Sequence, residues 1–455
     1  MVSETQFGSL GIPAHLRTLT LPVIASEWAG LIPITFHLAS QTFDYQLTGE
    51  ISLTGRLFIG IFPRLGVFNR ISQLLEREFD FIERAAVSGG AGAEVWDVLH
   101  GSRFPSANGA AAAILNAFVL SKLRQKRTVV EDLPCEMPER NDDIKSTSTS
   151  ESISFPNSVL PIVQPQGQQP IPKQEFKRQQ TLHVLFFSRK VQKPTYLQHK
   201  LEALHSFLLS PTAEIIRLLS LLSCTVILFL FGLYGTAAAV LTSCISSLLS
   251  LLISLPRPAT LLGNNLEGSQ HFGSMLFGPH QNCSTWYLYT GDRGIVDGIL
   301  NKPMLVRTHA RKTVRAYACW FGCAHVVQLL AMTYVGAQKG WDGVAMVMAM
   351  VLDFVFGIAL YNHHFIARRF LREQGVHVKA RTLEFTGRKS MIAAVLAYSG
   401  SQKVSWMNDI LAPDVARNAM LERVCAGEMA AASRQERLAI RGLKMLRAEF
   451  PLKGL

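Results

Sequence analysis

The sequence predicts an all-α membrane protein with about four transmembrane helices in two hairpins, together with cytoplasmic N-terminal, loop and C-terminal regions. Only 17% of the 455 residues are charged and the mean hydropathy is +0.20, whereas soluble domains average about 25% charged residues. No Asp, Glu, Lys, Arg or His occurs from Leu218 to Leu255. Two further apolar segments, Ala316 to Ala337 and Gly343 to Asn362, are separated by only a short turn.

The first apolar region, residues 215–255, is too long for one span. A straight helix from Leu218 to Leu255 would extend about 57 Å at 1.5 Å per residue, but the hydrocarbon core is only about 30 Å thick. Gly232 and Gly235 accept turn conformations and therefore mark the reversal. The second half is rich in Ser and Thr, so a re-entrant or interfacial segment is the alternative to a full span.

The second apolar region, residues 314–366, is expected to form an antiparallel helical hairpin because the connecting turn is so short. Basic residues cluster before the first span, before the third span and after the fourth. Four spans place all three clusters on one face, which the positive-inside rule makes cytoplasmic. Both termini are then expected on the cytoplasmic side of a multi-pass membrane protein.

The remaining segments divide by composition. Residues 1–130 form an N-terminal region and residues 131–180 a Pro-rich linker expected to be disordered. Residues 181–214 form a basic juxtamembrane segment, residues 256–313 a cytoplasmic loop and residues 367–455 a basic C-terminal region. Leu19 to Phe36 is apolar but is not assigned as a span, because prolines and Glu27 interrupt it.

Two amphipathic helices are expected outside the spans. In Asn69 to Val87, apolar residues recur at helical spacing, which favours core packing over attachment to a membrane surface. A second helix is expected from Asp414 to Phe450, with basic residues beside its apolar positions. It either lies on an anionic membrane or packs on its own domain.

A polar cluster is expected inside the second hairpin. Asp353 lies at the middle of its span, where a carboxylate is costly and must face protein or water. Counting from the turn, His325 lies at nearly the same depth as Asp353, and Gln328 lies one helical turn from His325. The cluster is either a proton-handling or substrate-binding site, or a hydrogen-bonded contact that joins the helices.

The loop between the hairpins holds further candidates. Asp292, Arg293, Asp297 and Lys302 lie in a glycine-punctuated stretch, where glycines beside an arginine can form an anion-binding nest. The spacing matches neither a nucleotide-binding fingerprint nor a metal site, so a loop that packs against helix ends is the simpler interpretation. We expect no cofactor and no metal.

The net charge of +12 limits the partners. The basic residues flank apolar stretches, so anionic lipid headgroups of the bilayer are expected to attract them, and no nucleic-acid-binding motif is visible. The seven cysteines are scattered and odd in number, which argues against a secreted disulfide framework.

Three stretches carry a resemblance: Gly291-Asp292-Arg293-Gly294 through Asn301-Lys302-Pro303, Gly340-Trp341-Asp342-Gly343, and Ser405-Trp406-Met407-Asn408-Asp409-Ile410-Leu411. Together they resemble uncharacterised integral membrane proteins of filamentous fungi over roughly the C-terminal half. This resemblance implies membrane residence and no particular activity.

Three hypotheses for function follow. The leading one is a scaffold or partner-binding membrane component, because long soluble regions flank a small helical bundle. The second is an oligomeric transporter or proton-conducting protein that uses Asp353 and His325, and the homo-oligomer is required because four spans enclose little space. The third is a membrane enzyme that acts on a lipophilic substrate.

Overall fold

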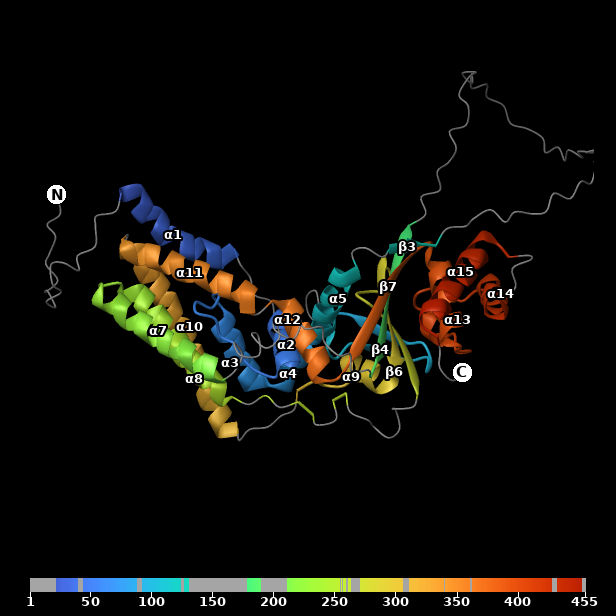
Figure 1. Cartoon of the computed structure of the whole chain (residues 1–455), viewed down its shortest axis with the longest axis horizontal. Helices are drawn as coiled ribbons and strands as arrows, with labels where there is room; N and C mark the ends of the chain where they lie inside the picture. Colours follow the sequence, from blue (N-terminus) through green and yellow to red (C-terminus); the bar gives the residue numbers. More distant parts are fainter. Residues whose placement is uncertain are drawn as a thin grey trace, which may run out of the picture.

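The computed structural model is elongated, with a bundle of helices at one end and a β-sheet flanked by helices at the other (Figure 1). It describes residues 22–39, 44–87, 92–123, 127–130, 178–189, 211–253, 271–305, 311–338, 340–360, 362–427 and 432–451, together with positions 255, 257–258 and 261–262. Most of the expected linker, residues 131–180, lies outside this range.

The prediction of an all-α fold is wrong, because a seven-stranded mixed sheet forms the centre of one end. Its order is β2-β1-β5-β6-β4-β7-β3. The β4–β6 and β3–β7 pairs are parallel and the other pairs are antiparallel. The strands are β1 (Glu94–Asp97), β2 (Arg103–Pro105), β3 (Arg127–Val129), β4 (Gln179–Ser188), β5 (Phe272–Gly278), β6 (Thr285–Asp292) and β7 (His377–Thr386).

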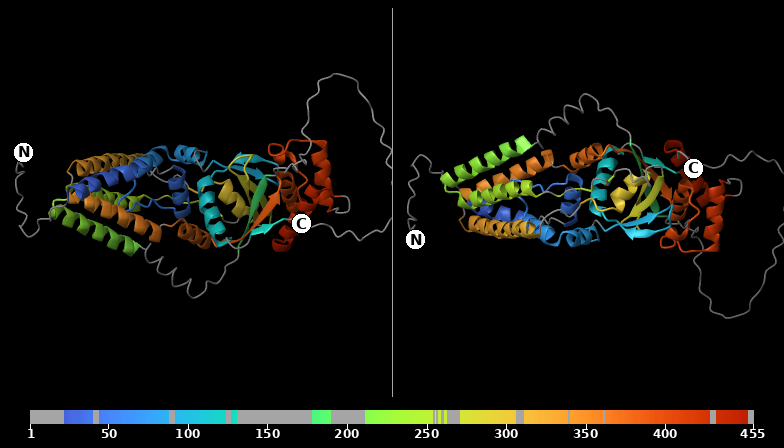
Figure 2. Two further views of the ribbon diagram at one scale, coloured as in Figure 1. Left: turned by 90° about the horizontal axis from the view of Figure 1, so that it is seen from above. Right: turned by 90° about the horizontal axis from the view of Figure 1, so that it is seen from below.

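Both faces of the sheet are covered, which gives three layers (Figure 2). On the face toward the bundle, Leu185, Phe187 and Tyr289 pack against α5 (Gly109–Leu123), α9 (Arg293–Leu300) and α12 (His363–Glu373). On the other face, Leu182 and Trp286 pack against α13 (Arg388–Ser399), α14 (Val415–Ala426) and α15 (Arg434–Glu449). Neighbouring residues of β4 enter opposite cores because side chains alternate along a strand.

The bundle consists of α1 (Val23–Ala39), α7 (Pro211–Leu230), α8 (Tyr234–Leu252), α10 (Arg311–Gln338) and α11 (Trp341–Leu360). Among the described residues, three helices are long and apolar enough to cross a membrane: Thr212–Leu230, Tyr234–Leu252 and Thr313–Gln338. The count of about four is therefore corrected to three, and the expected fourth span, most of α11, is not among them. Between the bundle and the sheet lie α2 (Asp44–Thr54), α3 (Val67–Arg77) and α4 (Phe79–Val87).

The bundle helices are inserted between strands of the sheet. The chain leaves β4, passes through α7 and α8, and re-enters the sheet at β5. It later leaves through α10 and returns along α11 and α12 to β7. The expected juxtamembrane segment, cytoplasmic loop and C-terminal region therefore all contribute strands, namely β4, β5, β6 and β7.

Two expected single helices are each divided in the structure. Asn69 to Val87 forms α3 and α4, which meet at Glu78 with a positive φ of 48°. Its apolar residues Ile71 and Leu74 are buried in a core with α10, so core packing is confirmed. The segment from Asp414 to Phe450 forms α14 and α15, because Gly427 ends α14 in the left-handed conformation. The apolar face of α15 lies in the core beneath the sheet.

Candidate functional site

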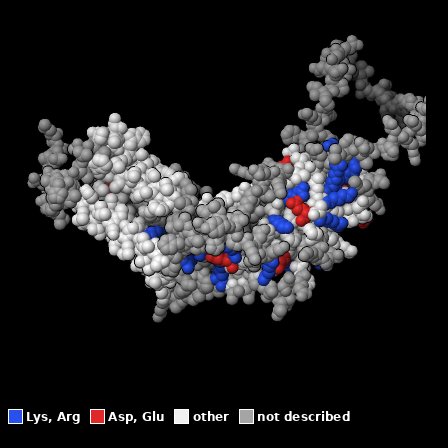
Figure 3. All heavy atoms as spheres, in the orientation of Figure 1, with Lys and Arg blue, Asp and Glu red and all other residues white. Residues whose placement is uncertain are grey.

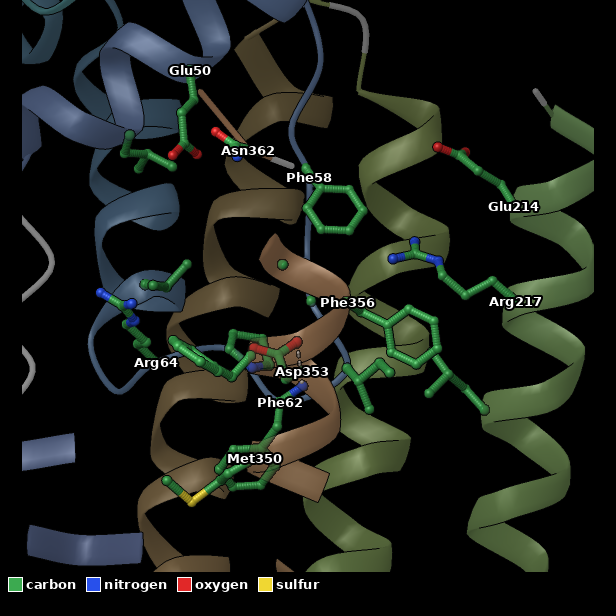
Figure 4. Close-up of a pocket in the computed structure, with 18 of the residues that line it drawn as sticks. Glu50, Phe58, Phe62, Arg64, Glu214, Arg217, Met350, Asp353, Phe356 and Asn362 are labelled. Carbon is green, nitrogen blue, oxygen red and sulfur yellow. Dashed lines mark hydrogen bonds between the residues drawn. The ribbon is translucent and has the colours of Figure 1, made fainter. Parts of the chain in front are cut away.

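A cavity of about 850 Å³ lies where the bundle meets the sheet end. Its walls come from five parts of the chain that are distant in sequence: the end of α1, helix α2, the segment 58–64, the first turns of α7, and the second half of α11 with the start of α12. Figure 4 shows α7 on one side of this space and α2 with α3 on the other, with α11 between them.

The inner wall is the extended segment from Phe58 to Arg64, which two bundle helices hold by its backbone. The Phe62 amide donates to Asp353 Oδ1 at 3.2 Å, and Gln328 Nε2 donates to the Pro63 carbonyl oxygen at 2.5 Å. Gly60 allows this approach, because a Cβ at that position would overlap Asp353 Oδ1. The segment therefore supplies the polar partners that a carboxylate in an apolar helix requires.

The expected cluster of His325, Gln328 and Asp353 is only partly brought together. Gln328 and Asp353 bond to successive residues of the same segment. Among the described residues, His325 Nδ1 has no hydrogen-bond partner and no bond joins it to Asp353. Hairpin geometry considered only α10 and α11. The segment 58–64, which accepts from Gln328 and donates to Asp353, was not part of that argument.

The α7 wall carries two opposite charges that sequence reasoning missed. Arg217 lies with its guanidinium 4.9 Å from the centre of the Phe58 ring, and its Nη1 donates to the Ile59 carbonyl oxygen at 2.9 Å. Glu214, one turn earlier, has a buried Oε2 without a hydrogen-bond partner among the described residues. Both side chains extend from α7 toward the cavity (Figure 4). In the sequence, this pair could have been found from two opposite charges three residues apart at the start of an apolar helix.

The rim nearest the sheet carries a second pair. His363 Nε2 lies 3.0 Å from Glu50 Oε1, and this hydrogen bond raises the pKa of the His363 imidazole. Asn362 begins α12 by accepting from the His364 amide at 3.0 Å. Glu50 and His363 are hydrogen-bonded to each other. On the α7 wall, by contrast, Glu214 Oε2 has no hydrogen-bond partner among the described residues.

The expected loop candidates lie elsewhere, at the junction of β6 and α9. The side chains of Asp292, Asp297 and Lys302 have structural partners there. Asp292 caps α9 by accepting from the Gly294 amide at 2.9 Å and forms an ion pair with Arg189 at 3.2 Å. Asp297 pairs with Lys302 at 3.3 Å. Arg293 begins α9, and its backbone packs against Gly273 of β5. The interpretation as a loop is corrected to a strand–helix junction.

Two buried residues outside the cavity have structural surroundings. Asp342 is buried at the far end of the bundle, where it accepts from the Gly235 and Thr236 amides, each at 2.8 Å. Cys283 is buried, and burial raises the pKa of its thiol to about 11, which makes it unreactive. Within the described ranges, no three His, Cys, Asp or Glu side chains are grouped as metal ligands would be.

Fold and site together define a class: a mixed α/β protein whose sheet carries a bundle with three helices able to cross a membrane, and whose cavity lies at the junction. No family model, no curated protein and no solved structure matches the chain.

Proposed function

We propose that this chain is a multi-pass membrane protein that takes up a lipid-like amphiphile in the junction cavity. Both the length of the bundle helices and the apolar side chains on the bundle surface support a location in a membrane. Only 11% of the apolar stretch in α7 is buried, and Ile227 and Phe229 are more than half exposed. A soluble protein rarely exposes a continuous apolar surface of this kind.

The route of the chain supports more than one crossing. Strands β4 and β5 belong to the same sheet, so a chain that crosses in α7 must return in α8. The sheet would lie on one side of the bilayer. Figure 3 shows Lys and Arg over the sheet end and almost none over the far end of the bundle on this face. By the positive-inside rule the sheet side is then cytoplasmic.

One observation carries the proposal for the cavity: charged groups and exposed apolar side chains line the same space. Glu50, Glu214 and Arg217 line it together with three apolar side chains of α7 and α11 that are each 47–60% exposed, namely Ile216, Phe354 and Phe356. An amphiphile has the polar and apolar parts that such a mixed lining accommodates. The alternative of proton conduction receives less support, because Asp353 bonds to Phe62 and not to His325.

The experiment compares two substitutions on α7. Ser220 lines the cavity, and Ser223, one turn further along, is exposed outside it. We expect Ser220→Trp to fill the space and remove most of the lipid that co-purifies with the detergent-solubilised protein, measured by mass spectrometry. Ser223→Trp should leave that lipid unchanged. Equal lipid content in both variants and the wild type would show that the cavity is not the binding site.

A further inference from the structure

We propose that the ligand of the cavity is a zwitterionic phospholipid, whose ammonium group is bound by Glu214 and whose phosphodiester is bound by Arg217. This inference rests on the proposed function and names the chemistry of its ligand. Three observations support it: the order of side chains along α7, the unused hydrogen-bonding groups of Glu214 and Arg217, and the charges elsewhere in the cavity.

The order along α7 matches the order of groups in such a lipid. Glu214 is nearer the sheet and Arg217 lies one turn deeper, at the level of Phe58 in Figure 4. Three residues of α-helix correspond to a rise of about 4.5 Å, which an amine and a phosphate joined by two carbons can span. Ser220 and Leu221 follow at the next turn and also line the cavity, where the glycerol esters and the acyl chains would begin.

Two contacts fix the position of Arg217 and leave N–H donors of its guanidinium group unused. Its ring contact with Phe58 and its single hydrogen bond to Ile59 fix the guanidinium plane. Among the described residues it forms no ion pair, so the rest of its planar fork is available. A guanidinium presented in this way suits the oxygens of a phosphodiester, which it can bind with two parallel hydrogen bonds.

Glu214 distinguishes a zwitterionic headgroup from an anionic one. Its Oε2 is buried and has no hydrogen-bond partner among the described residues, and a buried acceptor without a partner is costly. An anionic lipid bound to Arg217 would place a second negative charge beside this carboxylate. An ammonium group would instead provide the missing donor and charge.

The other two acidic side chains of the cavity already have hydrogen-bond partners. Glu50 bonds to His363, and Asp353 accepts from the Phe62 amide deeper in the cavity. Arg64 on the far wall and Arg217 on α7 are both close enough to act on the charge of Asp353. The acyl chains would continue past Ser220 and Leu221 and leave between α7 and α11, where Phe354 lines the cavity and is 56% exposed.

The experiment measures binding of phosphatidylethanolamine, phosphatidylglycerol and diacylglycerol to the full chain in detergent by native mass spectrometry. We expect the wild type to prefer phosphatidylethanolamine, and Glu214→Gln to reduce this preference roughly tenfold, as loss of one charge-assisted bond predicts. Arg217→Gln should weaken both phospholipids roughly tenfold and leave diacylglycerol unchanged. Arg217→Lys should keep part of the binding because it keeps the charge. Glu422→Gln and Lys444→Gln, both exposed on α14 and α15, are matched controls.

The outcomes separate this inference from the function on which it rests. Binding of diacylglycerol alone, or equal binding of both phospholipids with no effect of Glu214→Gln, would overturn the headgroup assignment and leave the cavity a lipid site. No binding of any of the three, with Ser220→Trp indistinguishable from the wild type, would overturn both. A thermal unfolding curve for each variant identifies any loss of binding that is due to loss of the fold.

Discussion

Gly60 is the residue on which the inner wall of the cavity depends, because the segment around it touches the carboxylate of Asp353. We expect Gly60→Val to force the two apart and to lower the free energy of unfolding by about 1–3 kcal/mol, the usual cost of overpacking. Thermal unfolding in detergent measures this. Gly357→Ala is the control, since a Cβ there meets nothing within 4 Å. Equal stability of the two variants would contradict the close contact.

The pair of His363 and Glu50 predicts a small dependence of stability on pH. The hydrogen bond that His363 donates to Glu50 raises the pKa of His363 in the folded state. The stabilisation is therefore complete below the ordinary histidine pKa and is lost as the pH rises through the raised value. The side chains are 45% and 40% exposed, so we expect less than about 1 kcal/mol. The stability difference between wild type and His363→Gln, followed from pH 5.5 to 8.5 (~3 units around the ordinary pKa), should shrink. A constant difference would contradict it.

At the same scale, the sequence identified Asp353 correctly as a residue that needs polar surroundings, but assigned it the wrong partner. The assignment considered only the hairpin in which Asp353 lies. Its actual donor is the amide of Phe62, 291 positions away in the chain. No periodicity or local spacing reports a contact of that separation, so the segment 58–64 and the α7 pair could be found only from the folded structure.

At the scale of elements, the two hairpins are joined at their far turns by Asp342. This residue in the first turn of α11 caps α8, because its carboxylate accepts from the first amides of that helix. We expect Asp342→Ala to lower the free energy of unfolding by on the order of 2–4 kcal/mol, since two buried amides would lose their acceptor. Asp414→Ala is the matched control, because Asp414 occupies the N-cap of α14 without a side-chain hydrogen bond. An equal loss of stability in both would contradict the capping role.

Element boundaries show where local signals suffice. The apolar runs of α7, α8 and α10 were predictable because length and hydropathy alone identify them. The breaks at Glu78 and Gly427 were not predicted, since helical periodicity continues across each. Strands β1 to β3 are at most four residues long, which is too short for an alternation pattern to distinguish them from loops.

At the scale of the whole molecule, the position of α1 bears on which side of the proposed bilayer the start of this helix lies. Ala29 and Gly30 lie against Gly343 and Gly336, at the turn of the bundle farthest from the sheet, and α1 begins at that end (Figure 1). If the bundle lies in a bilayer, the start of α1 and the sheet are on opposite sides. This placement does not support the expectation that both termini are cytoplasmic.

This placement can be tested by measuring which cysteines an impermeant maleimide labels on vesicles in which the protein has a known orientation. The other cysteines of the chain are replaced in each variant. Val23→Cys, at a position 74% exposed, should react only from the side opposite the sheet. The native Cys425, exposed on α14, should react only from the sheet side. Reaction of both cysteines from the same side would contradict this placement and agree with the expectation that both termini lie on one side.

The insertion of both hairpins between strands has a consequence for biogenesis. When β4 leaves the ribosome, its neighbours β6 and β7 have not yet been synthesised, because α7 with α8 precedes the first and α10 with α11 precedes the second. Pairing across such long separations is slow and exposes unpaired edges in the meantime. The sheet therefore remains incomplete until the segment that contains α10 and α11 has been synthesised. If the bundle inserts in a bilayer as proposed, slow insertion of either hairpin would prolong the exposure of these edges.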